Sequence, residues 1–261
     1  MNNAAPAQAA KSHPWPKRIA IALAVVLFAG AVGFGAYVSD YYHAQDTFTL
    51  LSDAKAISVE ENDESIAIAP PGSLEGKLPI EAGVVFYPGA KVDPHAYVPL
   101  AEKLADKGYL CVIAKMPFNL AFLGTDAASD IMDGYPQADS WWIAGHSLGG
   151  VAAAQYAAKH ADILEGIAFL ASYPASDLSE TGLSALSIYG SQDFVLNLDS
   201  LAENADKLPA NAKTVVIEGG NHAGFGAYGP QKDDGEAAIS ADEQQETFVD
   251  AFDAMASADR Q

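Results

Sequence analysis

The sequence predicts an α/β protein with a doubly wound, mostly parallel sheet of about eight strands, preceded by one apolar helix. Eight short runs after residue 54 have strand character, and five helical runs follow them in alternation. Strands that alternate with helices pair in parallel through right-handed crossovers. Most strand runs are apolar without interruption, as expected where helices cover both faces of a sheet.

The predicted elements begin with an antiparallel hairpin, because strands Lys55–Val59 and Ser65–Ala69 flank a polar run. The alternation then runs in order through strand Ala82–Tyr87, helix Tyr97–Lys107, strand Tyr109–Ala114, helix Thr125–Asp133, strand Ser140–Ala144, helix Leu148–Lys159, strand Leu164–Leu170, strand Ser184–Tyr189, helix Asp199–Leu208, strand Lys213–Glu218 and helix Ala241–Ala256. Only about a dozen residues separate the strand that ends at Leu170 from the next one, so at most a minimal lid is predicted.

The amino-terminal part predicts a membrane anchor. Residues 1–17 are expected to form a disordered cytoplasmic tail, and residues 18–39 a transmembrane signal-anchor helix whose last 21 residues carry no charge. Those residues span about 30 Å as a helix, and the basic residues before them place the following domain outside the cytoplasm. A cleaved secretory signal is the alternative, with weak cleavage sites at residues 31–33 and 33–35. Residues 40–54 are then a linker, and residues 55–261 the folded domain.

The charge is unevenly distributed and excludes some partners. Residues 1–39 hold three of the 14 basic residues and none of the 34 acidic ones. Residues 40–261 therefore carry 11 basic against 34 acidic residues, a formal charge of −23. Phosphate backbones would repel such a domain, so nucleic acid is excluded as a partner. No acidic cluster has the spacing of a calcium-binding loop, so no metal is predicted, and no cofactor is predicted either. The single cysteine, Cys111, is expected to be a small buried apolar residue.

Residues 145–149, Gly-His-Ser-Leu-Gly, carry the clearest chemical motif. They follow a predicted strand and open an Ala-rich helix, which is the context of a nucleophile elbow. A turn this tight puts Ser147 in a strained backbone conformation at the tip of the sheet. Side chains at Gly145 and Gly149 would collide with neighbouring elements, so we predict that both glycines form the structural elbow and that Ser147 is the nucleophile.

A serine hydroxyl needs a base, and His222 is the predicted one. It follows the last predicted strand, in the chain order Ser, acid, His that such elbows use. The other five histidines have structural or peripheral positions; His146 is expected to support the elbow, and the rest are His13, His43, His95 and His160.

The predicted orienting acid is Asp193, which follows the strand before the last one and a short turn. Asp177 and Asp199 are its rivals, and Asp177 follows an earlier strand where some hydrolases place this acid. Two backbone N–H groups are predicted to bind the oxyanion: that of Leu148, and that of Ala90 in the loop after strand Ala82–Tyr87, where Gly89 permits the turn.

Together these residues resemble the α/β-hydrolase superfamily over about residues 45–258, and more closely bacterial membrane-anchored or secreted serine α/β hydrolases related to dienelactone hydrolases. The runs that carry the closer resemblance are Phe86–Val92, Gly145–Gly150 and Gly219–Gln231. The resemblance implies the α/β-hydrolase fold and the triad Ser147, Asp193 and His222. Dienelactone hydrolases have cysteine where this chain has Ser147, and many relatives have His-Gly where it has Pro88-Gly89.

The predicted function is a serine hydrolase that cleaves a carboxylic ester of a small molecule through an acyl-enzyme, outside the cell membrane to which its helix anchors it. A peptidase of the same fold and a membrane-anchored, non-catalytic binding protein are the alternatives. The apolar residues that either line the substrate pocket or pack under a loop are Met116, Phe118, Leu120, Phe122 and Phe225.

Overall fold

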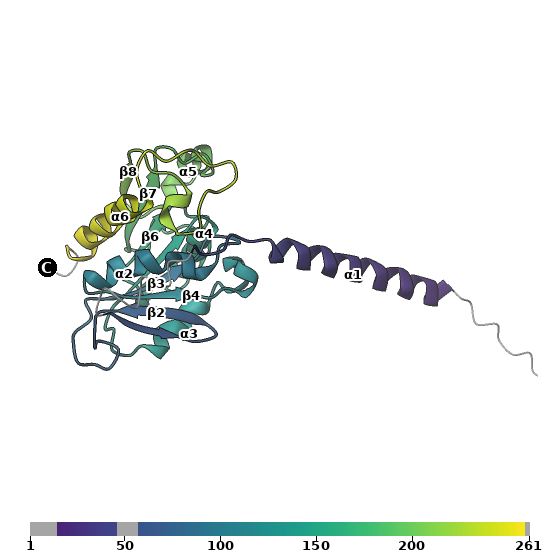
Figure 1. The fold of residues 1–261 in the computed structure, drawn as a ribbon, viewed down its shortest axis with the longest axis horizontal. Helices are drawn as coiled ribbons and strands as arrows, with labels where there is room; N and C mark the ends of the chain where they lie inside the picture. The colour runs from purple at the N-terminus through teal and green to yellow at the C-terminus, as the bar shows by residue number, and fades with distance from the viewer. Residues whose placement is uncertain (1–14, 46–56, 259–261) are drawn as a thin grey trace, which may run out of the picture. The chain divides into compact units, whose positions relative to one another are not determined.

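The computed structural model describes residues 15–45 and 57–258 (Figure 1). They divide into two compact units, one ending at Asp40 and one beginning at Tyr41. Residues 1–14 of the tail predicted over residues 1–17, most of the predicted linker and the first two residues of the predicted hairpin lie outside the described residues.

The described part of the first unit contains helix α1 (Trp15–Ser39), whose described side chains are almost all exposed. Its residues Arg18–Ser39 are long and apolar enough to cross a membrane by length and composition. A signal sequence near an amino terminus has the same properties. The apolar helix is therefore confirmed, but it begins at Trp15, so residues 15–17 are helical where a disordered tail was predicted. A proline such as Pro16 is tolerated in the first turn of a helix. The choice between an anchor and a cleaved signal stays a prediction.

The second unit is built on one eight-stranded sheet in the order β1-β2-β4-β3-β5-β6-β7-β8. Strand β2 runs antiparallel to both β1 and β4, and all other neighbouring strands are parallel, which confirms the predicted mixed sheet. The strands are β1 (Ser58–Glu61), β2 (Ser65–Ala69), β3 (Gly83–Tyr87), β4 (Leu110–Ala114), β5 (Trp141–His146), β6 (Gly166–Leu170), β7 (Ser184–Gly190) and β8 (Lys213–Ile217).

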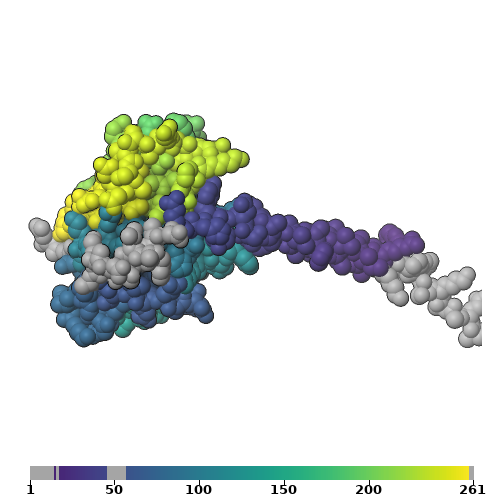
Figure 2. All heavy atoms as spheres, viewed as in Figure 1, coloured from purple at the N-terminus to yellow at the C-terminus, as the bar shows by residue number. Residues whose placement is uncertain are grey.

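Helices cover both faces of this sheet (Figure 1). They are α2 (Val98–Asp106), α3 (Ala127–Gly134), α4 (Leu148–Ala157), α5 (Leu198–Glu203) and α6 (Ala241–Ala256). Successive residues of a strand point to opposite faces. Thus Val84 and Phe86 of β3 pack with α2 and α6, while Val85 and Tyr87 pack with α3 and α4. The yellow spheres of the carboxyl-terminal segment, which includes α6, lie on the face shown in Figure 2.

One predicted helix is wrong in its second half. The helix expected over Asp199–Leu208 ends as α5, and a short 3₁₀ turn, Ala205–Lys207, replaces the rest. Asn204 leaves the helical conformation with φ −102° and ψ 5°, and its side-chain amide donates to the Ser200 carbonyl at 2.7 Å. Asparagine competes in this way with the backbone bonds that would extend a helix.

The topology brings the loops of interest to one edge of the sheet. Strands β3, β5, β7 and β8 are parallel members of the sheet, so the loops at their carboxyl ends share that edge. Those loops contain residues 88–93, Ser147, Asp193 and His222.

Candidate active site

Ser147 sits in a strained turn between β5 and α4. Its φ of 53° and ψ of −123° lie in a region that residues with a side chain rarely adopt. Both of its backbone groups are held in place: its N–H donates to the Leu170 carbonyl at 2.9 Å, and its carbonyl accepts from the Ser172 hydroxyl at 2.7 Å. The surrounding structure thus fixes the conformation predicted for a nucleophile elbow.

The two elbow glycines leave no space for a side chain. A Cβ at Gly145 would lie 2.5 Å from backbone atoms of Gly149. A Cβ at Gly149 would lie 2.1 Å from the Tyr87 carbonyl oxygen. These neighbours are backbone atoms, which cannot move aside as a flexible side chain can. Close approach between α4 and the end of β3 therefore requires glycine here.

Gly149→Ala is expected to lower the free energy of unfolding by about 3 kcal/mol, because the added methyl group collides with backbone. Gly134→Ala is the matched control, since no heavy atom lies within 4 Å of a Cβ there. We expect it to change stability by less than about 1 kcal/mol. Urea unfolding of both variants measures the difference, and equal stabilities would contradict the assigned crowding.

His222 and Asp193 form a buried pair. The His222 Nδ1 lies 2.9 Å from Asp193 Oδ2 and 3.1 Å from Oδ1. Their side chains are 2% and 0% exposed. Asp193 Oδ1 also accepts from the N–H groups of Val195 and Leu196, at 3.0 and 2.8 Å, so the carboxylate cannot rotate away. An acceptor at Nδ1 places the proton of a neutral His222 there and leaves Nε2 as the basic nitrogen.

The Nε2 atom of His222 is buried and has no hydrogen-bond partner among the described residues. An unsatisfied buried nitrogen is costly and calls for an explanation. His222 and Ser147 line the same pocket, of about 180 Å³. The histidine with the unpartnered nitrogen therefore lines the same cavity as the strained serine.

The rivals of Asp193 do not reach the histidine. Asp177 is exposed and accepts from the N–H and hydroxyl of Ser179, at 3.0 and 2.7 Å, which lower the pKa of its carboxyl. Asp199 is exposed in the first turn of α5. Within the described chain, Asp193 is the carboxylate hydrogen-bonded to the His222 ring.

The pocket at Ser147 is walled by α4 and by the loops after β6 and β7. Its other lining residues are Leu148, Val151, Ala171, Ser172, Tyr173, Val195, Leu196 and Asn197. None of the five apolar candidates from the sequence lines it. Three of them are buried in packing, Met116, Leu120 and Phe225, and two are exposed, Phe118 and Phe122.

The two predicted oxyanion donors flank the elbow. Leu148 is the first residue of α4, and a helix leaves its first N–H groups unsatisfied. Ala90 lies in the turn closed by the Val92 N–H and the Gly89 carbonyl, 3.3 Å apart. Within the described residues, neither Leu148 N–H nor Ala90 N–H donates to another residue. Both amides are free for a ligand, but only Leu148 lines the pocket.

The Alpha/beta hydrolase family model matches residues 83–246, from β3 into α6. The chain belongs to the alpha/beta hydrolase family. This confirms the superfamily resemblance predicted from residues 86–92, from the elbow and from residues 219–231, the loop that contains His222 and is called the histidine loop below. No curated protein matches the sequence.

Several solved structures share the fold at low sequence identity. Est1E from Butyrivibrio proteoclasticus is 15% identical with a TM-score of 0.57, over 78% of this chain and 99% of that one. A bacterial membrane phospholipase A is 13% identical with a TM-score of 0.60, over 94% and 99%. A dienelactone hydrolase from Anabaena variabilis is 13% identical with a TM-score of 0.56, over 77% and 97%.

In this alpha/beta hydrolase, a buried hydrogen-bond chain joins the loop after β3 to the histidine loop. The Gly89 N–H donates to the Tyr97 hydroxyl at 3.0 Å, and that hydroxyl lies 2.8 Å from His146 Nδ1. His146 Nε2 lies 3.1 Å from the His222 carbonyl, which can only accept, so Nε2 carries the proton and Tyr97 donates to Nδ1. The His146 side chain, expected to support the elbow, thus holds the backbone of His222.

Burial is the main reason that the pKa of His146 lies well below its usual value, and the neighbouring His222 lowers it further. The unfolded chain therefore binds a proton at His146 below about pH 6.5 that the folded chain does not bind, so stability falls as pH drops below that value. We expect wild type to lose up to about 1.4 kcal/mol per pH unit more than His146→Gln between about pH 6 and pH 5. Urea unfolding of both proteins at each pH tests this. If the stabilities of wild type and His146→Gln fall in parallel as the pH is lowered, the expectation is contradicted.

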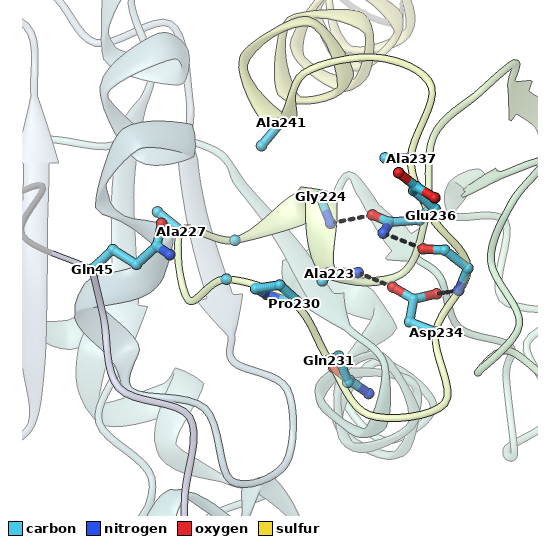
Figure 3. Close-up of a pocket in the computed structure, with 14 residues that line it drawn as sticks. Gln45, Ala223, Gly224, Ala227, Pro230, Gln231, Asp234, Glu236, Ala237 and Ala241 are labelled. Atoms are coloured by element: carbon cyan, nitrogen blue, oxygen red, sulfur yellow. Dashed lines mark hydrogen bonds between the residues drawn. The ribbon is translucent and has the colours of Figure 1, made fainter.

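Asp234 is a residue that sequence reasoning missed. Its carboxylate accepts from the N–H groups of His222 and Ala223, at 3.2 and 2.9 Å, and so fixes the backbone that carries the base. Figure 3 shows Asp234 reaching the loop at Ala223. No motif marks this aspartate, because its run, residues 231–235, resembles an ordinary polar turn. Only the folded loop shows what it contacts.

A second hollow, of about 510 Å³, lies behind the histidine loop and is drawn in Figure 3. Small residues such as Ala223 and Gly224 line much of it, with Gln45 at one side. It is larger than the pocket at Ser147 but does not contain Ser147 or His222. Among the described residues, no group of three or more His, Cys, Asp or Glu side chains is arranged to share a metal ion.

Proposed function

We propose that this chain is a serine hydrolase that cleaves carboxylic esters through an acyl-enzyme, with Ser147, His222 and Asp193 as its triad. One observation carries the proposal: a buried His222 is held by Asp193 at one nitrogen, its other nitrogen has no partner among the described residues, and the residue lines the same pocket as the strained Ser147. A base with a vacant acceptor beside a hydroxyl is the arrangement that acyl transfer needs.

The reaction follows from these positions. The Ser147 oxygen attacks the ester carbonyl while His222 Nε2 takes its proton, and Asp193 stabilises the imidazolium. The negative oxygen of the tetrahedral intermediate accepts from the N–H groups of Leu148 and Ala90. The intermediate collapses to the acyl-enzyme as His222 returns the proton to the leaving alkoxide. Water then attacks the acyl carbon, again deprotonated by His222, and the acid departs as Ser147 regains its proton.

The names of structurally similar proteins favour an ester over an amide. They include a membrane phospholipase A, a putative lipase and dienelactone hydrolases, all of which act on ester or lactone bonds by name. The pocket of about 180 Å³ is smaller than the roughly 300–1,000 Å³ of pockets that enclose drug-sized ligands. We therefore expect short acyl chains to be preferred.

The experiment is a substrate screen with the full chain purified in detergent. We expect hydrolysis of p-nitrophenyl acetate and butyrate to exceed that of long-chain esters, and no cleavage of peptide anilides. Preferred cleavage of the anilides would make the protein a peptidase. A folded protein that cleaves neither class would be a binding protein on a hydrolase fold.

We also propose that α1 anchors the chain in the cell membrane with the hydrolase domain outside the cytoplasm, because Lys17 and Arg18 precede the apolar run. Alkaline phosphatase fused to the carboxyl terminus is then expected to be active. Activity of a cytoplasmic reporter alone at that position would reverse the orientation. Release of the domain into the medium would identify a cleaved signal.

A further inference from the structure

The segment Tyr41–Gln45, directly after α1, belongs to the hydrolase domain and contacts its active-site loops. Tyr42 pairs with Val92 as a parallel bridge beyond the end of β3. The Tyr42 N–H donates to the Lys91 carbonyl at 2.7 Å, and the Tyr42 carbonyl accepts from the Asp93 N–H at 2.9 Å. This part of the predicted linker is thus not free chain: Tyr42 forms an isolated parallel bridge beside the loop that contains Ala90.

The turn that this segment holds is strained. Lys91 has a φ of 58°, in the left-handed region that favours glycine. Its N–H donates to the Asn119 carbonyl at 2.8 Å, while its carbonyl accepts from Tyr42. Non-glycine residues persist in such conformations only where neighbours hold them. Ala90, whose N–H is a proposed oxyanion donor, directly precedes Lys91. The direction of the Ala90 N–H therefore depends on the conformation of this turn.

The same segment also holds the loop that follows the base. The Gln45 N–H donates to the Ala227 carbonyl at 2.8 Å, and the Tyr42 hydroxyl accepts from the Lys232 N–H at 3.1 Å. The rings of Tyr42 and Tyr228 are 5.5 Å apart. Residues 223–232 continue directly from His222, and Figure 3 shows Gln45 beside the loop at Ala227.

We propose that residues 41–45 are a positioning segment, with Tyr42 as its central residue. The segment fixes the turn of residues 89–92, which contains Ala90, relative to the loop that follows His222. The inference rests on the proposed function, since it assigns Ala90 a part in the reaction. Both candidate cleavage sites, residues 31–33 and 33–35, precede the segment, so anchored and released forms would each keep it. Its role is to position the donors, not to touch the substrate.

Tyr42→Pro tests this in the full chain, because proline removes the N–H that holds the Lys91 carbonyl. We expect kcat to fall by about 10- to 100-fold with KM changed by less than about threefold, since a loosened donor weakens transition-state binding alone. His43→Pro is the matched control, because His43 is exposed and no hydrogen bond from its N–H is found in the described chain. We expect it to retain wild-type kinetics.

A rescue experiment separates positioning from general stabilisation. Lys91→Gly relieves the strain at φ 58°, so it is expected to restore kcat in the Tyr42→Pro background by at least about fivefold. Lys91→Ala removes the same side chain but keeps the strain, and is expected to restore nothing. Equal effects of the glycine and alanine variants would overturn the inference.

The outcomes also separate this inference from the proposed function. An inactive wild type would contradict the proposed function. If the wild type is active and Tyr42→Pro has the same kcat, only the proposed role of the segment is contradicted. If Tyr42→Pro does not fold, as judged by circular dichroism, Gln45→Pro replaces it, because it removes the bond to Ala227. We expect a loss of kcat of at least about fivefold there, and unchanged kcat in the folded variant would overturn the proposal.

Discussion

Ser147→Ala is expected to lower kcat for p-nitrophenyl acetate by about a million-fold, because removal of the nucleophile leaves only what the oxyanion donors and binding supply. The fold should persist, since Ser147 is held in its turn through its backbone N–H and carbonyl. Alanine at φ 53° is no more strained than serine, so the melting temperature should stay close to that of wild type.

Ser172→Ala is the matched control for that variant. Ser172 lines the same pocket and donates its hydroxyl to the Ser147 carbonyl at 2.7 Å. Its loss should cost no more than about tenfold in kcat, through a less firmly held elbow. If Ser172→Ala abolished turnover and Ser147→Ala did not, the nucleophile would be Ser172.

His222→Ala is expected to lower kcat by a similar factor of about a million, because the serine loses its base and the leaving group its acid. Residues of one catalytic unit are not additive, so the double variant with Ser147→Ala should lose little more than either single variant. Circular dichroism and urea unfolding establish that the variants are folded.

His95→Ala is the control for the histidine variants. Its ring is partly exposed and lies near Asp93 and Glu61, at 2.8 and 3.0 Å, away from the pocket. We expect wild-type kcat from it. Substantial turnover by His222→Ala would remove His222 from the proposed triad and leave its buried, unpartnered nitrogen without an explanation.

The sequence was sufficient to predict the fold class because its signals are local. Uninterrupted apolar strands, alternation with helices and the glycines around Ser147 each follow from a few neighbouring residues. The need for glycine at both elbow positions follows from the tightness of the turn, and the structure adds the backbone atoms that a side chain there would strike. The break at Asn204 was missed because a side-chain bond outweighed the helical pattern there.

Within the site, the residues that could be predicted are those marked by a motif or by their position after a strand. The residues that could not be predicted are those that act through contacts between loops. The strand that each aspartate follows favoured Asp193 over Asp177, and the structure shows Asp193 hydrogen-bonded to His222 and Asp177 hydrogen-bonded to Ser179. Asp234 holds the backbone of His222 through its side-chain carboxylate, and Tyr42 holds residues 91 and 93 through its backbone N–H and carbonyl. Neither contact leaves a pattern in the sequence of a single chain.

The most direct test of the account is covalent labelling of the full-length protein with a fluorophosphonate probe, followed by mass spectrometry of its peptides. The probe reacts with a serine only where a base activates it. We expect one labelled peptide, modified at Ser147, with labelling lost in Ser147→Ala and strongly reduced in His222→Ala. Folded wild-type protein that takes up no label, or that takes it up at another serine, would contradict the account.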